Sequence, residues 1–394
     1  MKKLEKSVPV IRFKGFSEAW EQRKFIEIIN RLSKTSNSSI LPKVEYEDII
    51  AEEGRLNKDI SNKFDSRKGI LFQPKNILYG KLRPYLKNWL YPDFKGVAVG
   101  DFWVFEAIEA TPRFIYNLIQ SDSYQKVAND TAGTKMPRSD WTKVSNSSFF
   151  IPKESSEQKR IGTFFKQLDD TIALHQRKLD TLKQMKKGLL QQMFPKSEED
   201  VPKIRFADFD EEWYQRKLGE EFEKINERND GSFGKTHWIS VAKMYFVEPN
   251  KVLSNNIDTR TYVMRKGDIA FEGHSNTDFK FGRFVANDIG PGIVSELFPV
   301  YRHKTNYDNN YWKNAIQLEH IMAPIYSKSI TSSGNSSNKL DSKHFLNQKI
   351  YIADFEEQEK IGSIFKQLDN TIILYQNKLN KFDILKKAYL QTMF

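Results

Sequence analysis

The segment EQKRIGTFFKQLDDTIALHQRKLDTLKQMKKGLLQQMF at residues 157–194 returns as EQEKIGSIFKQLDNTIILYQNKLNKFDILKKAYLQTMF at residues 357–394. Both copies open with EQ..IG..F..LD..I and close with KK..LQ.MF. An internal repeat of this length reflects a repeated structural unit and has to be interpreted before any other feature. The sequence therefore predicts that one long element is used twice.

The repeated segment has the pattern of a long amphipathic helix. Its apolar residues recur mostly at steps of three and four, which places them in one stripe on a helix about 55 Å long. A narrow stripe on a charged helix needs a second helix to cover it, so we expect the two copies to pair as an antiparallel coiled coil. The alternative is that each helix lies on its own domain. The predicted coiled-coil positions are Ile161, Phe165, Leu168, Ile172, Leu179, Leu182, Ile361, Phe365, Leu368, Ile372, Leu379 and Phe382.

The starts of both helices carry capping-box patterns, in which a cap side chain and a residue three positions later exchange hydrogen bonds. The pairs are Ser155 with Gln158 and Asp354 with Glu357. These pairs predict helix starts near residues 155 and 354.

A second, shorter repeat precedes each variable region of the chain. VPVIRFKGFSEAWEQRKF at residues 8–25 returns as VPKIRFADFDEEWYQRKL at residues 201–218. The regions between the short and long repeats do not align with each other in sequence, although both mix strand-like apolar runs with helical stretches. The sequence thus predicts an α+β fold with a pseudo-twofold internal repeat. Its four segments are domain 1 at 1–152, the central helix at 153–196, domain 2 at 197–352 and the C-terminal helix at 353–394.

The composition agrees with a globular chain of two domains. Among 394 residues, 39% are hydrophobic and 13% aromatic, which is ample for packed cores. No apolar run is long enough to span a bilayer and the N-terminus lacks a signal-peptide pattern, so we expect a cytoplasmic protein without a membrane partner. The chain has no cysteine, which excludes disulfides and thiolate metal sites. Its formal charge of +11 favours a polyanionic partner.

Catalytic motifs are not apparent in the sequence. The tripeptide Gly234-Lys235-Thr236 lacks the earlier glycine of a phosphate-binding loop, and no strand-associated GxGxxG appears. The six histidines lack metal-ligand spacing. Acidic-x-Lys triplets at Asp93 and Asp278 occur by chance in a chain this charged. We therefore predict a binding protein that holds no metal or cofactor of its own.

Each variable region has two clusters of side chains suited to DNA, which is read by hydrogen-bonding groups at base edges and held by phosphate contacts. The alternative for each cluster is a solvated loop, and Leu82 with Leu86 favours a core strand for the first. Two of the clusters lie at matched distances before the repeated helices, as expected for two specificity loops on one frame. The predicted DNA-binding residues are Lys81, Arg83, Tyr85, Lys87, Thr134, Lys135, Arg138, Ser139, His274, Asn276, Lys280, Arg283, Lys328, Asn335, Asn338, Lys339 and Lys343.

With these repeats, the whole chain resembles the specificity subunit of type I restriction-modification systems. The order of the VP.IRF..F...W..RK and EQ..IG..F..LD..I motifs carries the resemblance. The second specificity loop, SSGNSSNKLDSKHF, departs from the first because it lacks the Met-Pro-Arg element.

The resemblance implies a non-catalytic subunit with two target-recognition domains held apart by the paired helices. Its partners would be double-stranded DNA, two methyltransferase subunits and two restriction and translocation subunits. S-adenosylmethionine, ATP and Mg²⁺ would belong to those partners. Unlike domains on a symmetric frame predict an asymmetric bipartite target with half-sites about one helical turn, roughly 34 Å, apart.

Two other functions remain open at this point. The first is a self-sufficient DNA-processing enzyme whose active site has no recognisable motif. The second is an adaptor whose domains bind peptides. Activity of the lone chain would favour the enzyme, and a lack of salt-dependent duplex binding would favour the adaptor.

Overall fold

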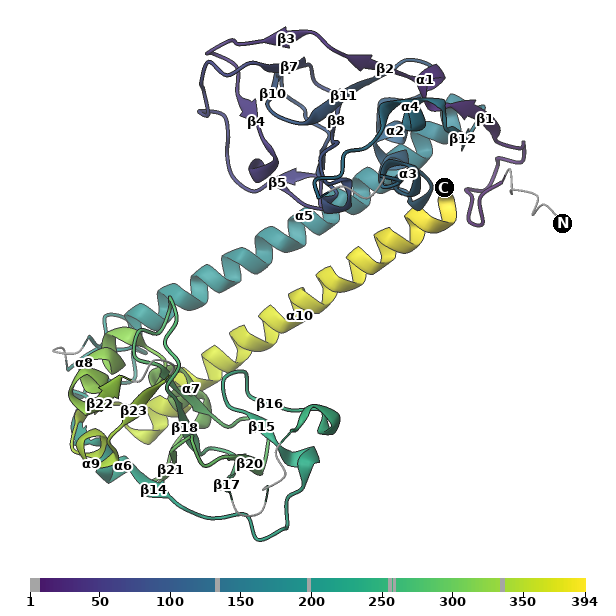
Figure 1. The fold of residues 1–394 in the computed structure, drawn as a ribbon. Helices are drawn as coiled ribbons and strands as arrows, with labels where there is room; N and C mark the ends of the chain where they lie inside the picture. The colour runs from purple at the N-terminus through teal and green to yellow at the C-terminus, as the bar shows by residue number, and fades with distance from the viewer. Residues whose placement is uncertain (1–7, 132–134, 197–199, 254–256, 258–259, 334–336) are drawn as a thin grey trace. The chain divides into compact units, whose positions relative to one another are not determined.

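The structure, a computed structural model, describes residues 8–131, 135–196, 200–253, 257, 260–333 and 337–394. The chain forms two compact units, and Figure 1 labels their elements. Unit 1 comprises residues 1–176 and 377–394, and unit 2 comprises residues 177–376. This division cuts across the four predicted segments, because each long helix contributes to both units.

Unit 1 contains short strands, short helices, the first part of one long helix and the last part of the other. In chain order its elements are β1 (Glu21–Lys24), α1 (Phe25–Ile28), β2 (Ile29–Leu32), β3 (Thr35–Ser36), β4 (Lys43–Val44), η1 (Tyr46–Asp48), β5 (Ile49–Ile50), β6 (Arg55–Leu56), β7 (Gly69–Phe72), β8 (Ile77–Gly80), η2 (Pro84–Leu86), β9 (Trp89–Leu90), β10 (Gly96–Ala98), β11 (Phe102–Ala107), α2 (Pro112–Leu118), α3 (Asp122–Ala128), α4 (Trp141–Asn146), β12 (Ser148–Ile151) and α5 (Ser155–Gln192).

Unit 2 repeats this order with some changes in its loops. Its elements are β13 (Tyr214–Lys217), α6 (Leu218–Glu221), β14 (Phe222–Ile225), η3 (Lys235–His237), β15 (Ile239–Ser240), β16 (Tyr245–Phe246), η4 (Pro249–Lys251), β17 (Thr261–Met264), β18 (Ile269–Glu272), β19 (Arg283–Ala286), β20 (Gly292–Ser295), β21 (Val300–His303), α7 (Asn309–Ala315), α8 (Glu319–Ser329), β22 (Ile330–Ser333), β23 (Asn338–Leu340), α9 (Ser342–Leu346), β24 (Lys349–Ile352) and α10 (Phe355–Met393).

The two variable regions share one topology despite their unlike sequences. Unit 1 has a sheet in the order β2-β11-β8-β9, and unit 2 has the matching order β14-β21-β18-β19. In each unit the strand near the end of the short repeat pairs antiparallel with the strand before the long helix, β1 with β12 and β13 with β24. The α+β fold and the internal repeat are confirmed. The repeat extends further than the sequence indicates, because many apolar residue combinations can fill one strand pattern.

A second group of strands closes each unit on the other side of that sheet. In unit 1 it is a four-stranded sheet in the order β3-β7-β10-β4, whose Phe72 shares a buried cluster with Leu78 and Val104 of the first sheet. In unit 2 the β17–β20 and β15–β16 pairs occupy the equivalent place in the chain. The part of each unit outside the long helices therefore has two layers of strands together with short helices, and we name this part the head of the unit.

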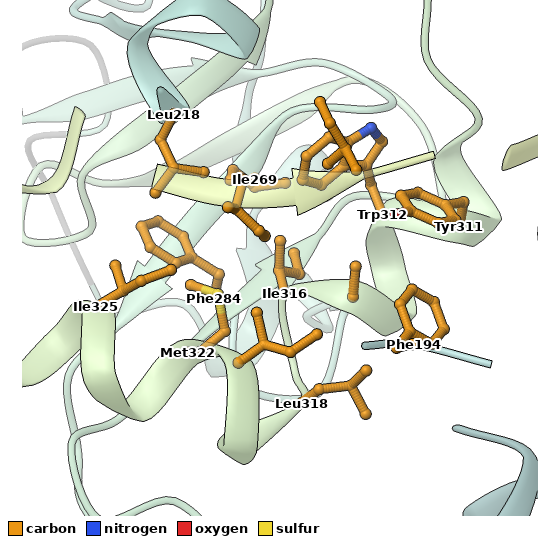
Figure 2. Close-up of a cluster of buried hydrophobic side chains, with 14 of the residues drawn as sticks. Phe194, Leu218, Ile269, Phe284, Tyr311, Trp312, Ile316, Leu318, Met322 and Ile325 are labelled. Atoms are coloured by element: carbon orange, nitrogen blue, oxygen red, sulfur yellow. The ribbon is translucent and has the colours of Figure 1, made fainter. Parts of the chain in front are cut away.

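The main core of unit 2 is assembled around the start of α10 and the end of α5. Figure 2 shows Phe194, which follows α5, beside Tyr311 of α7 within this buried cluster. The ring centroids of Phe194 and Tyr311 lie 5.2 Å apart, and those of Phe194 and Phe365 lie 6.1 Å apart. The Met-Phe end of the first repeat thus completes the core of the second head.

The Met-Phe end of the second repeat does the same in unit 1. Phe394 packs with Trp20, Phe114 and Phe165 at centroid distances of 6.4, 5.2 and 6.1 Å. In Figure 1 this C-terminal end of α10 lies beside the small helices of the first head. Ile161 and Phe165, predicted as coiled-coil positions, are almost fully buried in this core. The ends of the apolar stripe therefore serve the heads as well as the helix pair.

Within unit 1 the parts of α5 and α10 run antiparallel. Phe164 contacts Tyr389 at a ring-centroid distance of 4.9 Å, and further along α5 His175 contacts Phe382 at 5.2 Å. As the residue number rises on one helix, it falls on the other. The pairing of the middle positions into a coiled coil stays a prediction.

A buried carboxylate at the start of each long helix joins it to the short repeat of the same unit. Glu157 accepts two hydrogen bonds from the Arg12 guanidinium, at 2.7 and 2.8 Å, and one from Trp20 Nε1 at 3.3 Å. The second copy repeats these contacts with Arg205, Trp213 and Glu357 at 2.8–3.0 Å. We name each set of three a latch. The latches explain why the two repeated motifs occur together.

The capping-box prediction is wrong for the first helix. Ser155 is already the first residue of α5, and the Gln158 amide instead accepts from Thr111 N and donates to Pro152 O. At the second helix Asp354 Oδ1 accepts from Glu357 N at 2.7 Å, but the Glu357 side chain belongs to the latch. These polar residues hold the helix start against the head instead of closing a box.

Candidate nucleic-acid interface

The two predicted clusters of unit 1 meet in the structure. Leu82 pairs with Arg138 in an antiparallel bridge, Arg83 N donates to Pro137 O at 2.7 Å, and Ser139 N donates to Lys81 O at 2.9 Å. We name residues 81–87 and 135–139 loop pair 1. The loop leaves the central strand β8 at Gly80, so the sheet fixes its position. The alternative of a core strand is wrong for Leu86, which lies in the short helix η2 with 41% of its surface exposed.

Asp101 holds two of the cations of loop pair 1. Its carboxylate accepts from Arg138 Nη2 at 3.0 Å and lies 3.6 Å from Lys81 Nζ. The hydrogen bond from Arg138 lowers the pKa of Asp101, so the carboxylate is ionised at neutral pH. Both cations keep much of their surface exposed, at 52% for the Arg138 side chain and 31% for Lys81. They are oriented and still accessible to a ligand.

Tyr46 connects the backbone of Asp101 to the backbone of loop pair 1. Its hydroxyl donates to Asp101 O at 2.5 Å and accepts from Leu82 N at 3.1 Å. Burial raises the pKa of Tyr46, so the hydroxyl keeps its proton and can donate. Sequence reasoning missed both residues, because an isolated acid and a tyrosine do not form a DNA-binding pattern. The only signal was Gly100-Asp101 between two apolar runs.

The other predicted residues of loop pair 1 have different surroundings. Arg83, Tyr85 and Lys135 are exposed, and Lys87 forms an ion pair with Glu52 at 3.0 Å. Ser139 is buried and its hydroxyl donates to Ala128 O at 2.8 Å, which gives it a supporting place in the loop. Thr134 lies outside the described residues.

The two predicted clusters of unit 2 also meet, at the matching strand. Asn338 N donates to Gly273 O at 2.8 Å, directly after β18. A Cβ on Gly273 would lie 2.2 Å from Asn338 O, so this approach requires glycine. We name residues 273–283 and 337–343 loop pair 2. Because β18 is the counterpart of β8, both loop pairs leave the same position of the sheet.

The side chains of loop pair 2 differ from those of loop pair 1. Glu272 is buried, and its Oε1 interacts with both the backbone N and the Nδ1 of the exposed His274. Arg283 Nη2 donates to Ala242 O at 2.6 Å, and its guanidinium lies 4.7 Å from the centroid of the Phe279 ring. A carboxylate therefore orients a side chain of the loop here as well, but that side chain is a histidine and not an arginine.

Asn276 has a turn-forming role in loop pair 2. Its Oδ1 accepts from Asp278 N at 2.9 Å and from Phe279 N at 3.0 Å. This leaves the Asn276 amide nitrogen for a ligand. Lys280 beside the turn is exposed.

The remaining predicted residues of unit 2 fall into two places. Lys339 and Lys343 are exposed beside Asn338. Lys328 is exposed at the end of α8, where it lines a hollow of about 380 Å³ together with Pro195, Lys196 and Tyr351. Asn335 lies outside the described residues.

The described residues of both units were searched for metal-binding groups and membrane-spanning helices. Within the ranges given above, His, Asp and Glu side chains do not gather in groups of three that could hold a metal ion. In the same ranges, none of the helices combines the length and apolarity of a membrane span. In the described parts of the chain, basic side chains lie beside carboxylates in the loops that follow the interior strands β8 and β18, which suits the binding of a polyanion.

Comparisons with known proteins agree with this geometry. The sequence profile of the family described as "Type I restriction modification DNA specificity domain" matches residues 17–184. This part of the chain is therefore similar to the DNA specificity domain of type I restriction-modification systems. A search of curated protein sequences gave no match to the chain.

Solved structures of this family share the fold over nearly the full chain. The S subunit of a type I system from M. genitalium is 14% identical, with a TM-score of 0.61 over 98% of this chain and 99% of that one. A chain from a study of complex assembly and conformational transition of the type I system is 17% identical, with a TM-score of 0.54 over 94% and 96%. The fold of this chain is thus shared by these proteins at low sequence identity.

Proposed function

We propose that this chain is the non-catalytic subunit that selects the DNA target of a type I restriction-modification complex. Each unit would read one half of a bipartite site through its own loop pair. The single observation that supports this most is the placement of the two loop pairs at equivalent positions on β8 and β18. Because the loop pairs occupy equivalent positions, each unit would contact a duplex through the same end of its sheet.

The proposed target is asymmetric, because the two loop pairs offer unlike chemistry. Unit 1 offers Arg138 and Lys81 around Asp101, whereas unit 2 offers His274 on Glu272 and a separate Arg283. An arginine in a bidentate position favours guanine, and a different donor set favours different bases. Two unlike readers on one repeated frame select two unlike half-sites, separated by bases that neither touches.

The proposed partners are two methyltransferase subunits and two restriction and translocation subunits. S-adenosylmethionine, ATP and Mg²⁺ would be bound by those subunits and not by this chain. Large apolar side chains on the long helices support such docking, because exposed apolar surface marks contact sites. They are Leu174, Met185, Ile373, Leu374, Ile384 and Leu385, each between 41% and 68% exposed.

The experiment that tests the proposal is selection of duplexes from a random library by the purified full chain, with measurement of affinity against salt. We expect one asymmetric motif and a steep, linear loss of log affinity with log salt, as phosphate contacts require. The same preparation is incubated with S-adenosylmethionine and with ATP and Mg²⁺. We expect neither methylation nor cleavage.

The outcomes separate the alternatives. Methylation or cutting by the chain alone would show a self-sufficient DNA-processing enzyme. Retention of peptides, with no salt-dependent duplex binding, would show an adaptor. Either result would overturn the proposed function.

A further inference from the structure

The tip of loop pair 1 carries two large apolar side chains in an unusual place. Pro84–Leu86 form the short helix η2, and Tyr85 and Leu86 keep 57% and 41% of their surfaces exposed. Arg83 and Lys87 flank them on either side. Met136, on the adjoining segment, is 50% exposed. An exposed apolar tip between cations does not contribute to the core of the unit, so its surface is available to a ligand.

The backbone of this tip is held in a strained conformation. Five non-glycine residues within the described ranges have positive φ angles, and Arg83 (49°), Lys87 (55°) and Glu52 (65°) lie together at this tip. Non-glycine residues avoid this region, and such strain persists only where the surroundings impose it. Clusters of strained residues are typical of functional sites.

Hydrogen bonds on both sides impose the conformation. On one side Arg83 N donates to Pro137 O at 2.7 Å. On the other side Glu52 N donates to Lys87 O at 3.0 Å, and Lys87 Nζ lies 3.0 Å from Glu52 Oε1. The tip is therefore fixed before any ligand arrives, which reduces the entropy lost on binding.

The matching loop of unit 2 has no such tip. Between Gly273 and Arg283, all of which the structure describes, no large apolar side chain is exposed. Phe279 is covered in part by the Arg283 guanidinium. The apolar tip is thus specific to unit 1 and not a requirement of the shared fold.

We propose that Tyr85 and Leu86 form a wedge that unstacks one base step in the half-site read by unit 1, while Arg83 and Lys87 contact the neighbouring phosphates. The inference rests on the proposed function. Proteins that kink a duplex insert apolar side chains between base pairs in this way, with basic residues on the phosphates. Sequence steps that unstack easily would then be preferred at this position without a base-edge contact.

The test uses the purified full chain without partner subunits, so that any unstacking comes from this chain. The duplex carries the half-site selected from the random library, with 2-aminopurine at successive positions, because this base fluoresces more strongly when it is unstacked. We expect a several-fold rise at one step. Tyr85→Ala and Leu86→Ala should abolish the rise and weaken binding about tenfold, whereas Tyr85→Phe should retain both.

Leu297→Ala serves as the matched control, because Leu297 is an apolar residue of unit 2 that is 80% exposed. It should leave fluorescence and affinity unchanged, and thermal unfolding should show that all variants remain folded. Duplex binding with flat fluorescence at every position would overturn the wedge and leave the proposed function intact. A loss of affinity when thymine is replaced by uracil, again without a fluorescence rise, would assign the tip to groove contacts instead. A lack of any duplex binding would overturn both.

Discussion

At the residue scale, Asp101 and Arg138 give loop pair 1 its orientation. The Asp101 carboxylate accepts hydrogen bonds from two of the Arg138 guanidinium nitrogens, and the rest of the guanidinium is exposed to solvent. A side chain held in this way loses little entropy on binding and is suited to reading one base. Its removal should therefore affect one position of one half-site.

We predict that Arg138→Ala relaxes recognition at one base of the half-site read by unit 1, at a cost of about 1–3 kcal/mol. The half-site of unit 2 should keep its sequence. Arg283→Ala is the reciprocal control and should alter only the other half. Methylation of a randomised site library by the complete complex measures both halves, and a change in both halves by one variant would contradict independent reading.

His303 gives unit 2 a pH-dependent stability. The imidazole is largely buried between Phe222 and Tyr307, at ring-centroid distances of 4.3 and 3.8 Å, and burial lowers its pKa from 6.5 to about 3. Because the unfolded chain binds a proton at a higher pH than the folded chain does, this contribution is fully present above pH 6.5. It is lost as the pH falls toward 3.

The free energy of unfolding should fall by about 1.4 kcal/mol between pH 7.5 and pH 5.5. The lower pH is one unit below the ordinary pKa of histidine, and each such unit corresponds to about 1.4 kcal/mol. His303→Phe removes the titration, so the unfolding free energy of this variant should fall less over the same range. Chemical unfolding at the two pH values measures the difference. Equal slopes in both proteins would contradict a buried neutral histidine.

At the element scale, the start of each long helix shows how the repeated motif works. Besides the latch glutamate, each copy has a glycine that lets the head approach. A Cβ on Gly362 would lie 1.9 Å from Asp308 Oδ1, the atom that caps α7 by accepting from Tyr311 N. The atoms nearest to a Cβ on Gly162 would be two side-chain carbons of Arg113, at 3.1 Å, which is a much looser contact.

These two glycines provide a matched pair of substitutions. Alanine favours a helix interior by about 1 kcal/mol over glycine, which applies equally to both positions. We predict that Gly362→Ala nevertheless destabilises unit 2 by about 1–2 kcal/mol through loss of the α7 cap, and that Gly162→Ala costs less. Urea unfolding compares the two variants. A larger loss for Gly162→Ala would contradict the role assigned to Asp308.

The elements also show which features the sequence could predict. The two long helices, the α+β class and the internal repeat followed from periodicity and repeated motifs, because those patterns are local. The shared topology of the heads did not follow, because Gly80-Lys81-Leu82 and Gly273-His274-Ser275 have no residue pattern in common beyond the glycine. The supporting acids Asp101 and Glu272 were missed for a similar reason, since only the folded sheet places them beneath the basic loops.

At the scale of the whole molecule, each unit depends on residues from both halves of the chain. Phe394 completes the core of unit 1, and Phe194 completes that of unit 2. Equivalent ion pairs join the two long helices within each unit, with Lys386 to Asp169 at 2.9 Å and Lys186 to Asp369 at 2.6 Å. Because each long helix contributes contacts to both units, its sequence is repeated along its whole length while the sequences of the heads differ.

If the paired helices set the distance between half-sites, then lengthening both should change only the spacer. We predict that seven residues added to each helix, after Gln176 and Gln376, lengthen the permitted spacer by about three base pairs, from 1.5 Å per helical residue and 3.4 Å per base pair. A seven-residue insertion into α5 alone is the control and should impair folding. A change in the base sequence of the half-sites, with the spacer length unchanged, would contradict the proposal that the helices set the spacing.

The central claim is that two unlike units read two unlike half-sites. Methylome sequencing of cells that carry this chain with its methyltransferase subunits tests it most directly. We predict one asymmetric motif, made of two short specified halves separated by unspecified bases. A continuous motif, or a palindrome with identical halves, would contradict it.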